Sequence, residues 1–180
     1  MKKSTMLAVG LFVVNATAFA QKSVMVGGAE MYPTKNIIEN AVNSKDHTTL
    51  VAAVKAAGLV ETLQSAGPFT VFAPTNDAFA KLPAGTVDNL LKPENKATLS
   101  AVLTYHVLSG KFSSADVAKA IKAGDGKAEF KTVQGGKLWA MKEGKDVVLK
   151  DEKGNTSKIT IMDVNQSNGV IHVIDTVVMP

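Results

Sequence analysis

The hydrophobic period of the chain changes once, and this change most limits the fold that the chain can adopt. Between residues 37 and 122, apolar side chains recur every three or four positions, as in amphipathic helices. The run Phe69 to Ala73 is an exception that predicts a strand among these helices. From Ala128 onward, apolar and polar residues alternate, as in half-buried strands. Helices followed by hairpin strands are typical of an α+β domain with a mainly antiparallel sheet.

Three turn signals divide the strand-rich part of the sequence. Glycine-containing turns at residues 143–145 and 153–155 each lie between two alternating runs, which predicts successive hairpins. The third signal is Asn168-Gly169, and we expect this pair to adopt the positive φ angles of a tight hairpin turn. His172 in the strand that follows then lies on one face of the sheet, together with the residues two positions before and after it.

The first twenty residues have the order of a secretory leader. Lysines at positions 2 and 3 are followed by an apolar run at 6–14 and by a small-residue cleavage site at 18–20. We therefore expect residues 1–20 to be a signal peptide, removed on export to the periplasm or the medium, and residues 21–30 to be an N-terminal linker. The apolar run is shorter than the roughly 20 residues that cross a bilayer, so we expect no transmembrane segment.

The composition argues against two classes of protein. There is no cysteine, so stability has to come from a hydrophobic core and not from disulfides. All 20 basic residues are lysine, so the planar guanidinium group that grips phosphates and bases is missing. The formal net charge is +4, and it falls to +2 without the leader, which holds two lysines and no acid. We expect no nucleic-acid partner.

Three sequence blocks resemble the fasciclin domain family. They are TVFAPTNDAF at 70–79, the Tyr-His pair at 105–106 within LTYHVLSG, and NGVIHVIDTVVMP at 168–180. Three blocks in the family's order are far more specific than any one of them. They predict a single fasciclin domain over residues 31–180. The motif positions of the first and third blocks are Pro74, Thr75, Asn76, Asp77, Asn168, Gly169, His172 and Asp175.

The resemblance implies a fold and a kind of function. The fold is a helical layer packed on a mainly antiparallel, β-sandwich-like wedge. The function is that of a secreted, single-domain bacterial member that binds or adheres outside the cytoplasm, with a protein or glycan as partner. It implies no catalysed reaction and no cofactor, so we expect a protein that is not an enzyme. In the family, partner binding lies near the Tyr-His block, which makes Tyr105 and His106 candidate partner-binding residues.

The motif residues also have a structural interpretation. Thr75 or Asn76 suits the cap of a helix, Asp77 suits its first turn, and Pro74 fixes the preceding turn. His106 stands among apolar neighbours, so we expect it to be buried and hydrogen-bonded. Maintenance of the fold is the favoured interpretation of these residues, and contact with a partner is the alternative for the Tyr-His block.

Metal binding and hydrolysis have little support in the sequence. His47, His106 and His172 lack any ligand spacing, and the acids in the hairpin turns do not form a calcium loop, so we expect no metal. Neither a serine elbow nor a phosphate-binding glycine loop is present.

Two rivals to the binding module remain. One is a carrier of an apolar small molecule, such as a pigment, in a groove between helices and sheet, and the other is an uncharacterised hydrolase. For the binding module itself, the exposed faces of residues 128–150 and of the helix at 113–122 are candidate docking regions.

Overall fold

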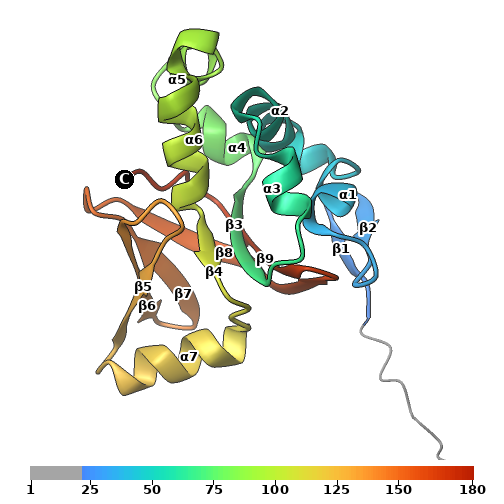
Figure 1. Cartoon of the computed structure of the whole chain (residues 1–180). Coiled ribbons are helices and arrows are strands. Elements are labelled where there is room, and N and C mark those ends of the chain that lie inside the picture. The colour runs from blue at the N-terminus through green and yellow to red at the C-terminus, as the bar shows by residue number, and fades with distance from the viewer. Residues whose placement is uncertain (1–21) are drawn as a thin grey trace, which may run out of the picture.

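The computed structural model describes residues 22–180, in which a group of helices packs on one end of a curved sheet (Figure 1). The helices are α1 (Ile37–Ala41), α2 (Thr48–Ala57), α3 (Val60–Gln64), α4 (Asn76–Ala80), α5 (Thr86–Leu90), α6 (Lys96–Tyr105) and α7 (Ser114–Ala123). The strands are β1 (Val24–Val26), β2 (Ala29–Met31), β3 (Phe69–Pro74), β4 (Val107–Ser109), β5 (Lys127–Lys131), β6 (Lys137–Glu143), β7 (Asp146–Lys150), β8 (Thr156–Gln166) and β9 (Gly169–Ile174).

The main sheet has seven strands in the order β4-β3-β9-β8-β7-β6-β5. All neighbours are antiparallel except β3 and β9, which run parallel. The long strand β8 pairs with β7 through its first residues and with β9 through the rest, and its register shifts twice between Ile159 and Val164. Such irregularities bend a strand. A bridge between Leu108 and Thr132 joins the two edges of the sheet, which closes it into a wedge. The expected α+β class with a mainly antiparallel sheet is confirmed.

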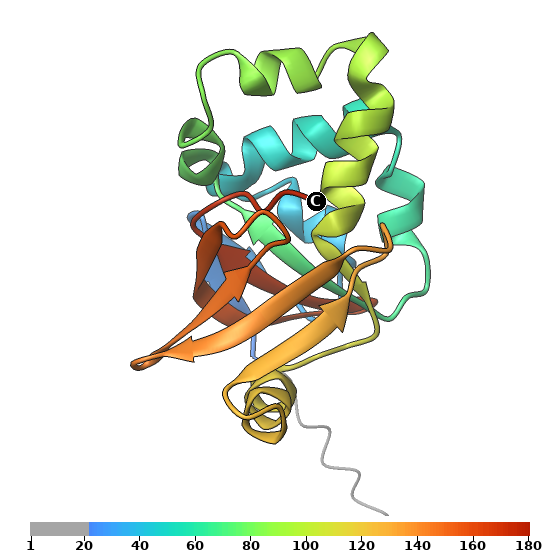
Figure 2. The same cartoon turned by 90° about the vertical axis from the view of Figure 1, so that its left-hand side faces the viewer.

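Two hydrophobic cores lie on opposite faces of β3 and β9. One contains Ile171 and Val173 and packs against α1, α2, α3, α4 and α6. The other contains Ile174 and lies between the inner face of β5–β8 and α7, which sits apart from the other helices (Figure 2). The His172 ring stacks on Phe72 of this second core, with the ring centroids 5.8 Å apart. The predicted alternation along β9 is therefore present.

The sequence predicts a linker at residues 21–30, but most of this segment forms two short strands. Strand β1 pairs with β2 in an antiparallel hairpin, and Gly27 and Gly28 turn the chain with φ angles of +57° and +73°. The hairpin buries Val26 and Met31 in the helical core. Strands of three residues are too short to show a period of two, so the hydrophobic pattern did not reveal them.

The prediction of positive φ angles at Asn168-Gly169 is wrong, although β8 and β9 do form a hairpin. Gln166 pairs with Gly169, and neither Asn168 nor Gly169 has a positive φ. The Asn168 side chain instead donates to the Leu63 carbonyl at 2.7 Å and so ties the hairpin to α3. A Cβ atom at Gly169 would lie 2.1 Å from the Phe69 carbonyl oxygen. Glycine is needed here for close approach of β3 and not for a left-handed turn.

The predicted leader, residues 1–20, lies outside the described residues. From residue 22 to the end of the chain, no helix is long and apolar enough to cross a membrane.

Candidate functional site

The first motif block holds the entry of α4. The Thr75 hydroxyl caps this helix by accepting a hydrogen bond from the Ala78 N–H at 3.2 Å. The Asn76 side chain reaches back to α2, accepting from the Thr49 N–H at 3.0 Å. Pro74 ends β3, and Asp77 lies in the first turn of α4, where an acid suits the helix dipole. These four residues join a strand to two helices.

The second block, Tyr105-His106, is buried beneath the surface. The Tyr105 side chain is 0% exposed, and its hydroxyl donates to the Lys137 carbonyl at 2.5 Å and accepts from the Glu152 N–H at 3.2 Å. It thereby joins α6 to β6 and to the turn after β7. Burial raises the pKa of Tyr105 to about 12, so the phenol is protonated at neutral pH.

His106 is 2% exposed and uses both ring nitrogens inside the fold. Its Nδ1 lies 2.7 Å from the Val102 carbonyl, and its Nε2 lies 3.2 Å from the Val178 N–H. A carbonyl only accepts and an N–H only donates, so the ring is neutral with its proton on Nδ1. Burial lowers the pKa of His106 to about 4. Both side chains are almost wholly buried, so neither presents an exposed surface in this fold.

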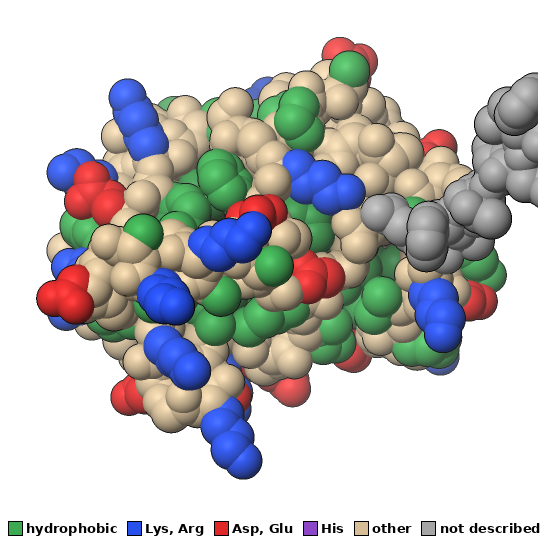
Figure 3. Space-filling model, turned by 90° about the horizontal axis from the view of Figure 1, so that it is seen from below, with side chains coloured by type: hydrophobic (Ala, Val, Ile, Leu, Met, Phe, Trp, Pro, Cys, Tyr) green, Lys and Arg blue, Asp and Glu red, His purple; other side chains and the backbone are tan. Residues whose placement is uncertain are grey.

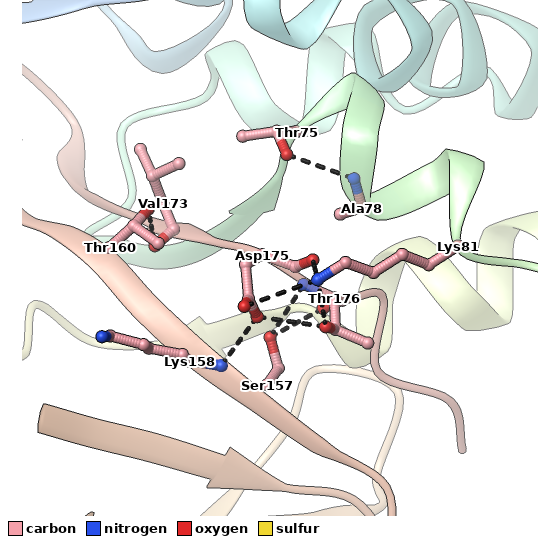
Figure 4. A network of polar contacts seen from close by, with 9 residues as sticks. All are labelled: Thr75, Ala78, Lys81, Ser157, Lys158, Thr160, Val173, Asp175 and Thr176. Atoms are coloured by element: carbon pink, nitrogen blue, oxygen red, sulfur yellow. Dashed lines mark hydrogen bonds and ion pairs between the residues drawn. The ribbon is translucent and has the colours of Figure 1, made fainter.

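The third block includes a polar cluster at the end of β9 (Figure 4). Asp175 accepts from the Lys158 N–H at 2.9 Å and lies 3.5 Å from the Lys81 ammonium of the segment after α4. Partial burial favours a raised pKa of Asp175, but the hydrogen bonds from Lys158 and Thr176 and the charge of Lys81 outweigh it and lower the pKa. This cluster fastens the end of β9 to β8 and to α4.

One serine, one aspartate and one histidine do lie close together, but not in a catalytic order. Ser114 donates both its backbone N–H and its hydroxyl to the Asp163 carboxylate. The Asp163 N–H lies 3.3 Å from His172 Nδ1, and His172 Nε2 lies 2.8 Å from the Phe112 carbonyl. Both nitrogens of His172 therefore face backbone groups, and a nucleophile needs a base that accepts its own proton. The arrangement fixes the start of α7 against the sheet.

An apolar cavity of about 50 Å³ lies between the helices and β3. Its walls include Ile37, Leu50, Val54, Leu63, Val71 and Leu103. His47 also lines it and is 1% exposed, with Nδ1 2.8 Å from the Ser44 hydroxyl. Within residues 22–180 its Nε2 has no hydrogen-bond partner. Burial lowers the pKa of His47. The nearby Ala73 backbone and the charge of Asp46 act to raise this pKa, but the effect of burial is larger.

The three histidines do not meet at a metal centre. Across residues 22–180, no group of three or more histidine, aspartate or glutamate side chains is arranged to hold a metal ion. Each histidine serves a different part of the interior: His47 a wall of the cavity, His106 the end of α6, and His172 the second core.

The sequence model of the fasciclin domain matches residues 45–180. The chain belongs to this family. The match covers all three motif blocks and confirms the resemblance drawn from them. It begins later than the predicted domain start at residue 31, although α1 and β2 pack into the same hydrophobic core as α2.

This fasciclin domain is similar to proteins of Synechocystis and Mycobacterium. The chain is 48% identical over 162 residues to Protein sll1483 of Synechocystis sp., covering 89% of this chain and 82% of that one. It is 37% identical over 145 residues to the cell surface glycolipoprotein MPB83 of Mycobacterium bovis, covering 78% of this chain and 58% of that one. A solved FAS1 domain pair from the insect cell adhesion molecule fasciclin I superposes with a TM-score of 0.70 at 17% identity, covering 81% of this chain and 51% of that one. The structural likeness confirms the fold.

The outer face of β5–β8 contains the exposed face of residues 128–150, which the sequence predicts as a candidate docking region, although Trp139 was not singled out there. Trp139 lies on this face with its indole N–H 3.1 Å from a Glu129 carboxylate oxygen, and the Lys127 ammonium lies 4.6 Å from the centre of its ring. A signal was present in the sequence: Leu138 and Ala140 point inward, so the tryptophan between them has to point outward. Trp139 is partly exposed on this face.

Proposed function

We propose that the mature fasciclin domain is an exported binding module that holds a protein or glycan partner on an exposed face and catalyses no reaction. The observation that carries this proposal is the burial of the Tyr-His block. Tyr105 and His106 use their polar atoms to join α6 to β6, to the turn after β7 and to the C-terminal segment. In this proposal the polar atoms of the two side chains hold in place the strands that the partner contacts.

The relatives support an extracytoplasmic setting for this module. One is named a cell surface glycolipoprotein, and the solved structure comes from a cell adhesion molecule. The apolar run and small-residue site near the start of the chain are consistent with export. In this proposal Tyr105 acts as a positioning residue, because it fixes Lys137 and Glu152 at the start of β6 and after β7.

The experiment measures binding of the labelled mature domain to intact envelopes of the producing cells. We expect saturable binding that unlabelled domain displaces, and a Lys55→Gln variant on the exposed face of α2 serves as a matched control with unchanged affinity. Binding that rises linearly with concentration, or that unlabelled domain fails to displace, would refute the module. The Tyr105→Phe variant should fold and bind with reduced affinity, since its hydroxyl no longer holds β6.

The lining of the apolar cavity, though not its volume, favours a second function, that of a small-molecule carrier. Its lining is almost wholly hydrophobic, as an apolar ligand requires. Its volume of about 50 Å³ is well below the roughly 300–1,000 Å³ of typical ligand pockets, so a pigment-sized molecule would have to separate the helices from β3. Mass spectrometry of the purified native protein distinguishes the two functions. A stoichiometric apolar molecule would support the carrier, and the absence of such a molecule would support the binding module.

A further inference from the structure

The outer face of β5–β8 carries an aromatic platform set among lysines. Strand pairing places Trp139 between Glu129 on β5 and Lys150 on β7. The side chains on the opposite face of these strands, such as Leu138 and Leu149, are fully buried in the second core. Strands β5 and β6 have no helix in front of them in Figure 2, so among residues 22–180 this side of the hairpins is open.

The positive charge of the mature chain is concentrated in this region. Residues 127–158 contain eight lysines and five acids, a net charge of +3. The remaining residues from 21 onward contain ten lysines and eleven acids, a net charge of −1. The lysines that Figure 3 shows are gathered mainly on the side of α7 and these hairpins. The hairpin region therefore carries the net positive charge of the mature chain.

Part of this charge is already neutralised and part is free for a partner. The Lys137 ammonium pairs with Glu129 at 3.0 Å, and that of Lys158 pairs with Asp146 at 2.7 Å. Lys127, Lys131 and Lys150 form no ion pair among the described residues. Lysines on an edge strand also hinder aggregation, which accounts for Lys127 and Lys131 on β5. Protection of an edge does not explain the presence of Lys150, because β7 has a neighbouring strand on each side, and it does not explain Trp139.

We propose that this face binds an acidic polysaccharide, with a sugar ring stacked on Trp139 and its carboxylates paired with Lys127 and Lys150. The inference rests on the proposed binding function and names the partner's chemistry. The electron-rich face of an indole attracts groups with partial positive charge, such as the C–H face of a sugar ring. Lysine supplies a compact charge that suits a carboxylate without demanding a bidentate geometry.

Other partners fit the face less well. A protein interface of standard size has an apolar centre depleted in charge, whereas here one aromatic ring is surrounded by charged side chains. Single-stranded nucleic acid is held by several stacked aromatic rings, and this face offers one. In the free domain Lys127 covers the ring, and a sugar carboxylate would draw that ammonium aside and free the ring for stacking.

The test uses the fluorescence of Trp139, the single tryptophan of the chain. Oligogalacturonate is titrated into the mature domain, with neutral dextran and polyglutamate as comparison ligands. We expect a saturable change in emission with oligogalacturonate, at least tenfold weaker binding of polyglutamate and none of dextran. An unchanged emission on adding oligogalacturonate, or equal affinity for polyglutamate, would overturn the proposal.

Variants separate the stacking contact from the charge contacts. By calorimetry, Trp139→Thr should weaken oligogalacturonate binding at least tenfold, and Lys127→Gln and Lys150→Gln several-fold each. Lys55→Gln, on the helical part, should change it less than twofold. Circular dichroism and a urea midpoint check that each variant is folded, and the two lysine variants keep the test decisive if Trp139→Thr fails to fold. Wild-type affinity in Trp139→Thr or in both lysine variants would contradict the site.

The envelope assay distinguishes this inference from the proposed function. If the wild-type domain binds envelopes and a folded Trp139→Thr variant binds them equally well, the module uses another face and the saccharide site is wrong. If the wild-type domain does not bind envelopes, the proposed function itself fails.

Discussion

Acid should destabilise this fasciclin domain, and His106 should carry much of the effect. The neutral ring donates from Nδ1 to the Val102 carbonyl and accepts at Nε2 from the Val178 N–H. A second proton on Nε2 would face that N–H and would place a charge in an apolar interior. This is the physical reason why the pKa of His106 is lowered to about 4.

The size of the effect follows from the two pKa values of the His106 side chain. In the unfolded chain a histidine has a pKa of about 6.5, so between about pH 6.5 and pH 4 the unfolded state binds more protons than the folded state. The stabilisation is complete above about pH 6.5 and is lost as the pH falls toward 4. Integration gives a free energy of unfolding about 2 kcal/mol lower at pH 5 than at pH 8. Burial lowers the pKa values of His47 and His172 as well, which adds in the same direction.

Urea unfolding at pH 8 and at pH 5, followed by circular dichroism, measures this difference. In His106→Gln the difference between the two pH values should shrink by about 2 kcal/mol, because the titrating group is gone whatever the variant's own stability. Lys55→Gln is the control and should keep the wild-type difference. An unchanged pH difference in a folded His106→Gln variant would refute the reasoning.

Three further substitutions test the interior contacts by urea denaturation. Tyr105→Phe removes a buried hydroxyl that joins α6 to β6 and should cost about 1–3 kcal/mol, whereas wild-type stability would show that this bond is unimportant. Gly169→Ala drives a Cβ against the Phe69 carbonyl and should cost about 1–3 kcal/mol or more, and wild-type stability in this variant would show that the close approach is unimportant. Thr75→Ala removes the cap of α4 and should cost about 1 kcal/mol, and a loss below a few tenths would argue against the cap.

The hydrophobic pattern of the sequence predicted much of the fold because this pattern determines which side chains are buried. The inward positions of β5 and β6 alternate as the sequence indicates, and the burial of His106 follows from its apolar neighbours. The β1–β2 hairpin was missed because its strands are too short to show a period. The Asn168-Gly169 pair was misread because its role is tertiary: the asparagine side chain bonds α3, far away in sequence.

The same limit applies to the candidate sites. The hydroxyl of Tyr105 bonds groups 32 and 47 residues away, which no local motif reveals. Trp139 was visible as an aromatic residue at an outward position, but its surroundings depend on strand register between β5, β6 and β7. Register is set by packing and turn geometry together, so the lysines around the ring emerge only from the folded sheet.

We propose that the motif residues hold the fold while the outer face of β5–β8 binds the partner. The most direct measurement is the set of backbone and indole NMR signals of the mature domain that move when a saccharide fraction released from the envelope is added. We expect the shifts to gather on β5–β8 and to include the Trp139 indole N–H. Shifts confined to the residues that line the apolar cavity, such as Leu50 and Val71, would contradict it and favour the carrier.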